Sequence, residues 1–140
     1  MSPPPLVIGD LRDDEIEAAI ALWRGAGLTR PWNDPHADAV LALAAPSSTI
    51  LAGRLGEMLA ATAMVGFDGH RAWVYYLGVS PALPGQGYGR AMMEACEAWA
   101  RARGAPKIQL MVRHDNAAAS GFYAALGYTA DSVQVLAKRF

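Results

Sequence analysis

The sequence predicts one domain of the mixed α/β class, in which helices cover both faces of a sheet of six or seven strands. Three observations predict this architecture. Apolar, β-branched runs are interspersed with Ala-rich stretches of helical periodicity. Three of these runs follow one another across tight turns, which indicates an antiparallel meander. A length of 140 residues, 53% of them hydrophobic, suffices for one well-filled core, so we expect residues 1–140 to form a single domain.

The N-terminal part is expected to hold one strand and two helices. Residues 5–9 read as a short strand, and residues 14–26 as a helix whose apolar side chains recur at helical spacing. Asp13 is a candidate N-cap for this helix. A second helix is expected over residues 35–44, with Asp34 as its N-cap and a proline at its first position.

The later elements follow from their turn signals. Gly-Glu and Asp-Gly pairs separate the strands of the meander, and a glycine-rich turn precedes a helix that contains no Gly or Pro. The expected elements are strands over residues 49–55, 58–67 and 71–79, a helix over 88–103, a strand over 107–112, a helix over 117–126, and strands over 128–131 and 133–140. The whole order is therefore β-α-α-β-β-β-α-β-α-β-β. Because a helix joins residues 71–79 to residues 107–112, those two strands should be parallel.

Composition and charge exclude several classes of protein. A net charge of −1 without a cluster of Lys and Arg argues against nucleic acid as a partner. The single cysteine, Cys96, excludes an internal disulfide and lies in a helical pattern typical of a core residue. No apolar run is long enough to span a bilayer and no leader is recognised, so we expect a cytoplasmic protein without a membrane partner. Three scattered histidines lack metal-ligand spacing, so no metal is expected.

The glycine-rich turn is the first candidate site. Gly85, Gly87 and Gly89 alternate between the strand at residues 71–79 and the helix that follows. Glycines allow a ligand to approach the backbone closely, and the first turn of a helix offers unpaired N–H groups and a dipole that favours anions. This arrangement predicts a phosphate-bearing ligand. An ordinary strand-to-helix turn that uses glycine only for tightness is the alternative.

The loop between the first two helices is the second candidate site. It carries Arg30, Trp32, Asn33 and Asp34 between two prolines. A tryptophan with polar neighbours in a loop is typical of a wall that binds substrate. Alternatively, Trp32 anchors the loop to the core while Asp34 caps the next helix, and this role is compatible with substrate binding.

Two motifs resemble the GNAT superfamily of acyl-CoA-dependent N-acetyltransferases. Residues 84–89, Pro-Gly-Gln-Gly-Tyr-Gly, are similar to the family's phosphate-binding signature, with proline in place of its first Gln or Arg. The run from Asn116 through Tyr123 to Tyr128 resembles the family's closing element. More narrowly, residues 28–35 and 73–81 look like those of the bacterial YpeA-type subgroup.

The resemblance implies acetyl-CoA as acyl donor, held where the strands at 71–79 and 107–112 splay apart. By this resemblance, backbone groups of Leu77, Gly78 and Val79 would pair with pantetheine as an added strand and polarise the thioester carbonyl. Asn116 would bond the pantetheine arm, and Tyr123 would be the general acid beside the sulfur. The pyrophosphate would lie on the amides of Gly85, Gln86, Gly87, Tyr88, Gly89 and Arg90.

The spacing of Asn116 and Tyr123 agrees with these roles. They are seven residues apart, which places them on one helix face roughly 10 Å from each other along the axis. Asn116 as an N-cap and Tyr123 as a core residue are the structural alternatives.

The sequence leaves the identity of the general base open. The strand at residues 73–79 contains no Glu or Asp. Tyr75 and Tyr76 are expected to point to opposite faces, one of them toward the acceptor channel. The candidates are a water ordered by either tyrosine, Asp34, and the pair His114–Asp115.

The expected activity is transfer of an acetyl group from acetyl-CoA to a primary amine, on a small molecule or a peptide N-terminus. The alternative is an acyl-CoA-binding sensor or partner subunit without turnover, favoured by Pro84 and by the missing strand carboxylate. Both a monomer and a homodimer are compatible with the sequence, since residues 133–140 are apolar enough to pair across a dimer.

Overall fold

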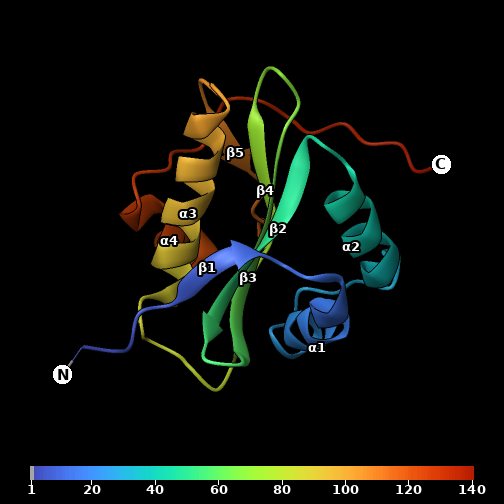
Figure 1. Cartoon of the computed structure of the whole chain (residues 1–140). Coiled ribbons are helices and arrows are strands. Elements are labelled where there is room, and N and C mark those ends of the chain that lie inside the picture. The colour runs from blue at the N-terminus through green and yellow to red at the C-terminus, as the bar shows by residue number, and fades with distance from the viewer. Residues whose placement is uncertain (1) are drawn as a thin grey trace.

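The computed structural model describes residues 2–140, and it holds a five-stranded mixed sheet flanked by helices (Figure 1). The strands lie side by side in chain order: β1 (Val7–Asp10), β2 (Ser48–Leu55), β3 (Met58–Phe67), β4 (Ala72–Val79) and β5 (Ile108–Leu110). Neighbouring strands are antiparallel except β4 and β5. These two are parallel, as predicted, because a helical crossover joins them.

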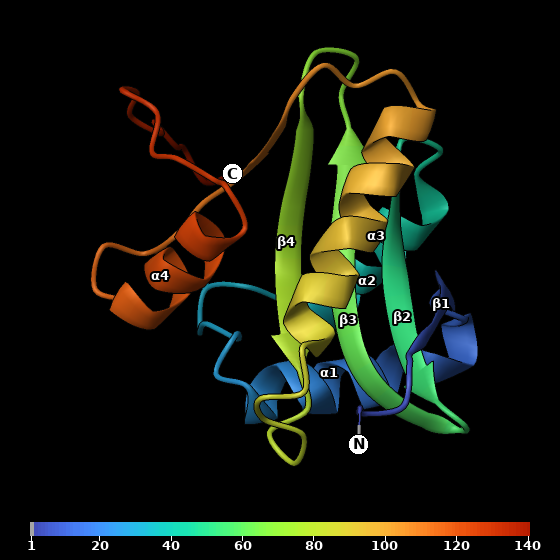
Figure 2. The ribbon, with the colours of Figure 1, turned by 90° about the vertical axis from the view of Figure 1, so that its left-hand side faces the viewer.

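The helices divide between the two faces of the sheet. One face carries α1 (Ile16–Gly25), which continues from the 3₁₀ helix η1 (Asp13–Glu15), and α2 (Pro35–Ala44). Figure 2 shows α3 (Tyr88–Ala102) packed on the opposite face. The last helix, α4 (Ala117–Ala125), lies beyond β4 in the same view and buries none of its residues fully. None of the helices within residues 2–140 has the length and apolar character needed to cross a bilayer.

Each face of the sheet has its own hydrophobic core. Under α1 and α2 the core is built around Trp23 and Ile50, both fully buried. Under α3 it contains Met92, Val65 and Cys96. The prediction that Cys96 is a core residue is confirmed, and burial raises the pKa of its thiol to about 12. The two cores arise because alternate side chains of β2 and β3 face opposite sides of the sheet.

Local signals predicted some element boundaries well. Helix α2 has the predicted bounds, and the Asp34 side chain caps it by accepting a hydrogen bond from the Ala37 N–H at 3.1 Å. Asp13 is not the N-cap of the first helix, because it already lies in η1. The chain turns one residue earlier, at Arg12, whose N–H donates to the Glu15 carboxylate at 2.9 Å.

The prediction of six or seven strands is wrong, since residues 2–140 contain five. The predicted strand at 107–112 shortens to Ile108–Leu110, and residues 128–140 form none. The C-terminal segment pairs with no strand, although the outer edge of β5 carries no neighbour in the described sheet. The apolar side chains of the C-terminal segment are consequently exposed, at Val133, Val135, Leu136 and Phe140.

An ion pair joins the first helical turn to the sheet. Glu15 of η1 accepts hydrogen bonds from the Arg54 guanidinium of β2 at 2.9 and 2.5 Å, and both side chains are largely buried. The hydrogen bond from Arg54, aided by the Arg12 backbone bond, lowers the pKa of Glu15 from 4.5 to about 2 despite desolvation. Because the folded pKa lies below the unfolded one, the stabilisation is complete above about pH 4.5. It is lost as the pH falls toward 2.

Glu15→Gln is expected to lower the free energy of unfolding by about 3 kcal/mol at pH 7, because it leaves Arg54 buried without its charge partner. The difference from wild type should shrink as the pH falls from 4.5 toward 2, where Glu15 itself becomes protonated. Urea denaturation at several pH values measures both quantities. Asp14→Asn is the control, because Asp14 is exposed and its ion pair with Arg12 contributes little. A pH-independent difference would contradict this account of Glu15.

Candidate functional site

Strand β4 has an open edge over its second half. Its pairing with β5 covers three residue pairs and ends at Val74 and Leu110. From Leu110 the chain leaves the sheet toward α4, so no strand of the described chain lies beside Tyr75–Val79 on that side (Figure 2). The two strands therefore part where the resemblance implied a splay. This unpaired edge of β4 at Tyr75–Val79, called the slot below, is the place predicted for an extended ligand.

A β-bulge in β4 lies at the start of this open edge. Tyr75 pairs with Met64 of β3 and Gly78 pairs with Thr62, so Tyr76 and Leu77 together stand opposite Ala63. Among residues 2–140, Tyr76 is the only non-glycine residue with a positive φ, at +52°. This backbone conformation costs an L-residue about 1–2 kcal/mol.

The bulge corrects the prediction that Tyr75 and Tyr76 point to opposite faces. Tyr75 lies opposite Met64, which packs on the core beneath α1 and α2, and Tyr76 packs on the same core. The extra residue cancels one step of the strand's alternation, so both tyrosines lie on one face. Tyr75 is 43% exposed there, whereas Tyr76 is only partly exposed.

A network of side chains holds Tyr76 in its strained conformation. The Trp23 ring stacks on the Tyr76 ring with centroids 4.1 Å apart. The Tyr76 hydroxyl donates to the Asp38 carboxylate at 2.8 Å. The Tyr76 carbonyl accepts from the Thr62 hydroxyl at 3.1 Å, and Thr62 in turn accepts from the Trp23 indole N–H at 2.8 Å. Burial, then Asp38, raises the pKa of Tyr76, so this hydroxyl stays a donor.

Sequence reasoning missed the role of Asp38. Only its position one helical turn after the Asp34 cap distinguished it from any exposed helix residue. Its partner Tyr76 is 38 residues away, and only the fold brings the two together. Helical spacing predicts an apolar position at Trp23, but neither its stacking on Tyr76 nor its bond to Thr62 follows from local pattern.

The glycine turn follows β4 directly and leads into α3. Gly85 and Gly87 have φ values of +70° and +79°, which only glycine adopts easily, and Gly87 is the N-cap of α3. No side chain caps this helix, so the amides of its first turn are available to a ligand. Gly89 lies against Val79 and Phe122, which places the turn at the end of the open edge.

The polar side chains of the turn have different surroundings. Tyr88 is buried, and its hydroxyl donates to the Pro4 carbonyl at 2.8 Å, so only its backbone faces outward. Gln86 is exposed and its amide nitrogen donates to the Pro84 carbonyl at 3.3 Å. Arg90 is exposed in the first turn of α3, where its charge adds to the positive end of the helix dipole.

Helix α4, which lies beyond the open edge of β4 in Figure 2, carries Asn116 and Tyr123. Asn116 caps α4, since its Oδ1 accepts from the Ala119 N–H at 3.0 Å. Tyr123 packs edge-to-face against Phe122 and Tyr128, and within residues 2–140 its hydroxyl makes no hydrogen bond. Burial, with a smaller effect of Cys96, raises the pKa of Tyr123 to about 12.

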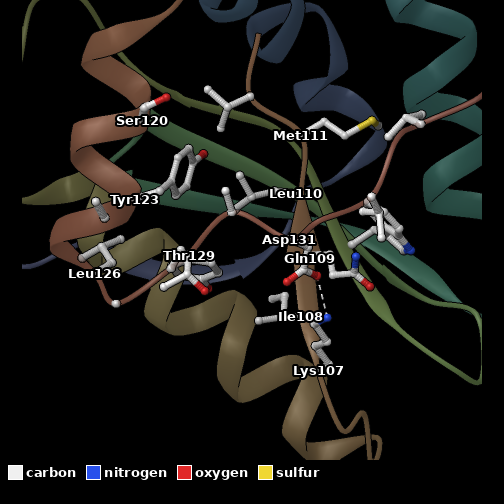
Figure 3. Close-up of a pocket in the computed structure, with 18 of the residues that line it drawn as sticks. Lys107, Ile108, Gln109, Leu110, Met111, Ser120, Tyr123, Leu126, Thr129 and Asp131 are labelled. Carbon is white, nitrogen blue, oxygen red and sulfur yellow. Dashed lines mark hydrogen bonds and ion pairs between the residues drawn. The ribbon is translucent and has the colours of Figure 1, made fainter. Parts of the chain in front are cut away.

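A cavity of about 1490 Å³ lies next to the slot, between β5, α4 and residues 128–136 (Figure 3). In that view Tyr123 projects from α4 toward Leu110 of β5. The cavity also contacts Trp73 and His114. The cavity includes neither the bulge nor the glycine turn, and Tyr123 is the one predicted catalytic or cofactor-binding residue that lines it.

The loop residues predicted to bind substrate are divided among several roles. Asp34 is a helix cap, and the Arg30 guanidinium donates to carbonyls of its own loop at 2.9 Å. Trp32 is 52% exposed, with the Arg139 guanidinium 5.6 Å from its ring centroid. Asn33 is exposed. The loop begins beside the slot, because a Cβ on Gly78 would stand 2.9 Å from Leu28.

The remaining candidates for a base or a metal site lie apart from the bulge. His114 and Asp115 are exposed in the segment between β5 and α4, where Asp115 pairs with Arg113 at 3.7 Å. Across the described residues, no group of three or more His, Cys, Asp and Glu side chains is placed to hold a metal ion.

Comparison with known proteins identifies similar chains and folds. Residues 12–128 match the acetyltransferase (GNAT) family. An acetyltransferase of Pectobacterium atrosepticum is 41% identical over 128 residues, which are 91% of each chain. The ribosomal-protein-S18-alanine N-acetyltransferase of Escherichia coli has a similar fold, with a TM-score of 0.78 and 24% identity over 91% of this chain and 79% of that one. An aminoglycoside N-acetyltransferase solved with CoA has a TM-score of 0.79 and 13% identity over 99% of both chains.

Proposed function

The chain belongs to the acetyltransferase (GNAT) family and is by homology an acetyl-CoA-dependent acetyltransferase, and from this premise we propose that it acetylates a primary amine. The acceptor is the amine of a small molecule or the N-terminus of a peptide. Within the family we assign the chain to the bacterial YpeA-type subgroup. We take residues 1–140 as one catalytic domain that acts as a monomer or a homodimer.

The observation that carries the proposal is the open edge of β4, which runs directly into the glycine turn. An extended pantetheine arm pairs with the backbone of Leu77–Val79 as an added strand would. The pyrophosphate then reaches the uncapped first turn of α3, where the amides from Gly85 to Arg90 bind it. Pro84 has no N–H, so the backbone amides that bind phosphate begin at Gly85, one residue later than the family's signature implies.

The reaction is a direct attack in one ternary complex. The neutral amine attacks the thioester carbonyl, a backbone N–H of the Leu77–Val79 segment stabilises the oxyanion, and the C–S bond then breaks. Tyr123 donates its proton to the leaving thiolate, and the amine loses its extra proton to an ordered water or a nearby carboxylate. The raised pKa of Tyr123 keeps the acid form populated at neutral pH.

Asn116 and the loop after α1 complete the assignment. Because the Asn116 Oδ1 is engaged in capping, its side-chain N–H₂ is the group left to bind a pantetheine carbonyl. On the acceptor side, exposed Trp32 and Tyr75 supply aromatic surface, and Arg30, Asn33, Asp34 and Tyr76 surround it as further substrate-binding residues.

A second function is favoured by the lack of a free carboxylate base among the predicted candidates of β4 and the loop after α1. Strand β4 contains no Glu or Asp, and Asp34, one of the candidate bases, is engaged as a helix cap. A non-catalytic acyl-CoA-binding sensor or partner subunit would need no base. The sensor and the enzyme share the donor site and differ in turnover.

The decisive experiment is a screen for CoA thiol release from acetyl-CoA against amines, amino acids and peptides, beside calorimetry of acetyl-CoA binding. We expect binding, and thiol release that depends on a primary amine. Boiled protein and tertiary amines are the controls, since a tertiary amine yields no stable amide. Binding without release from any acceptor would favour the sensor. Absence of acetyl-CoA binding would contradict the proposed donor site and, with it, both proposed functions.

A further inference from the structure

The bulge in β4 reverses which amides face the slot. Before it, the Ala72 N–H donates to the Lys107 carbonyl at 2.9 Å, so even-numbered amides point toward β5. After it, the Ser80 N–H donates to the Ala60 carbonyl at 2.8 Å, so even-numbered amides point toward β3. Because successive residues of a strand alternate their N–H groups between its two edges, Leu77 and Val79 present theirs to the slot.

The packing of the β4 side chains shows the same reversal. Val74 packs in the core under α3, and so do Leu77 and Val79 beyond the bulge. In an uninterrupted strand Val74 would share its face with even-numbered residues only. Removing the bulge would therefore turn the Leu77 and Val79 amides toward β3 and Gly78 toward the slot.

The bulge depends on a strained residue that is held from outside the sheet. Tyr76 has a φ of +52°, and its ring is fixed at two points: the Trp23 face and the Asp38 carboxylate. Trp23 lies on α1 and Asp38 on α2, so the two helices clamp one side chain of β4. Within the described residues, the bond to Asp38 is the only hydrogen bond that the Tyr76 hydroxyl donates.

We propose that Asp38 is a positioning residue for acyl transfer, which holds the Tyr76 bulge so that the Leu77 and Val79 amides face the thioester. The proposal rests on the proposed function of the slot. Asp38 itself need touch neither donor nor acceptor. Asp38 acts on the backbone of β4 through its hydrogen bond to the Tyr76 hydroxyl. Loss of Asp38 should therefore leave the proposed phosphate site at the glycine turn unchanged.

The test compares Asp38→Ala, Asp38→Asn and Tyr76→Phe. Alanine and phenylalanine remove the hydrogen bond, whereas asparagine keeps an acceptor oxygen in place. Asp38→Ala and Tyr76→Phe should lower kcat by about 10- to 100-fold, because small displacements of catalytic groups are costly. Acetyl-CoA affinity by calorimetry should stay within about three-fold. Asp38→Asn should recover most of the turnover.

Amide NMR signals supply a readout that needs no acceptor. The Leu77 and Val79 signals should shift in Asp38→Ala and in Tyr76→Phe, and remain close to wild type in Asp38→Asn. Tyr128→Phe is the matched control, because it deletes another tyrosine–carboxylate bond, to Glu97 at 2.6 Å, on the α3 face. It should leave the Leu77 and Val79 signals in place. The double variant Asp38→Ala/Tyr76→Phe should be no slower than either single variant.

The outcomes separate this inference from the proposed function. If wild type turns over and Asp38→Ala matches it in kcat and in both amide signals, Asp38 has no positioning role. Additive effects in the double variant would also overturn the proposal, because they would show that Asp38 acts apart from Tyr76. If wild type acetylates no acceptor, the proposed function fails, and the amide signals alone still decide whether Asp38 holds the bulge.

Discussion

Gly87→Glu is expected to reduce acetyl-CoA binding by more than about 100-fold while the fold persists. Gly87 is the N-cap of α3 and is exposed, with no atom within 4 Å of where a Cβ would lie. The new side chain therefore meets no neighbour in the protein. It would instead project a carboxylate into the place proposed for pyrophosphate, where it repels the anion and uses the same helix-end amides. Calorimetry with acetyl-CoA measures the loss, and circular dichroism follows the fold.

Gly104→Glu is the matched control for this variant. Gly104 lies just past the other end of α3, has a φ of +82° against +79° for Gly87, and likewise has open space around it. The two variants therefore introduce the same strain and the same charge at opposite ends of one helix. Gly104→Glu should bind acetyl-CoA like wild type. Equal affinities in both variants would show that the glycine turn does not bind phosphate.

Tyr123→Phe is expected to lower kcat by about 100-fold or more, with acetyl-CoA affinity nearly unchanged. The variant removes one hydroxyl that makes no hydrogen bond within residues 2–140, so the packing against Phe122 and Tyr128 should survive. What it removes is the proton for the leaving thiolate. Steady-state kinetics with a verified acceptor separates kcat from KM, and the raised pKa of about 12 predicts no alkaline loss of wild-type activity from Tyr123 below about pH 11.

The matching control is Tyr128→Phe, which makes the same chemical change on the neighbouring ring. Its hydroxyl donates to Glu97, so its loss should be felt in thermal stability more than in kcat. A donor with a better leaving group than CoA should partly restore turnover in Tyr123→Phe, since it needs less help from an acid. Wild-type kcat in Tyr123→Phe would remove this residue from the mechanism.

The elements that begin or end at a capping or turn motif were predicted correctly from the sequence. Helix α2 begins at a capping Asp and a proline, and β3 ends at an Asp-Gly turn, and both have the predicted bounds. Asn116 was predicted either to cap α4 or to bind the donor, and it does cap the helix. These features depend on contacts within a few residues, which is why pattern alone could find them.

The features that pattern missed depend on distant partners. Nothing local marks Tyr76 as a bulge, because tyrosine prefers extended backbone and the conformation is maintained by Trp23 and Asp38 from separate helices. Conversely, the C-terminal run has strand composition but pairs with no strand edge, so propensity predicted strands that residues 128–140 do not form.

The weak burial of α4 has a consequence for the cost of opening the site. Its residues are at most partly buried, whereas α3 places Met92, Met93 and Cys96 at the centre of a core. Lifting α4 away would expose less apolar surface than lifting α3, so its local unfolding requires a smaller part of the global unfolding free energy. The proposed proton donor thus belongs to a helix that costs less to detach than α3, the helix that the phosphate-binding turn begins. Entry and exit of a long donor molecule need disturb only α4.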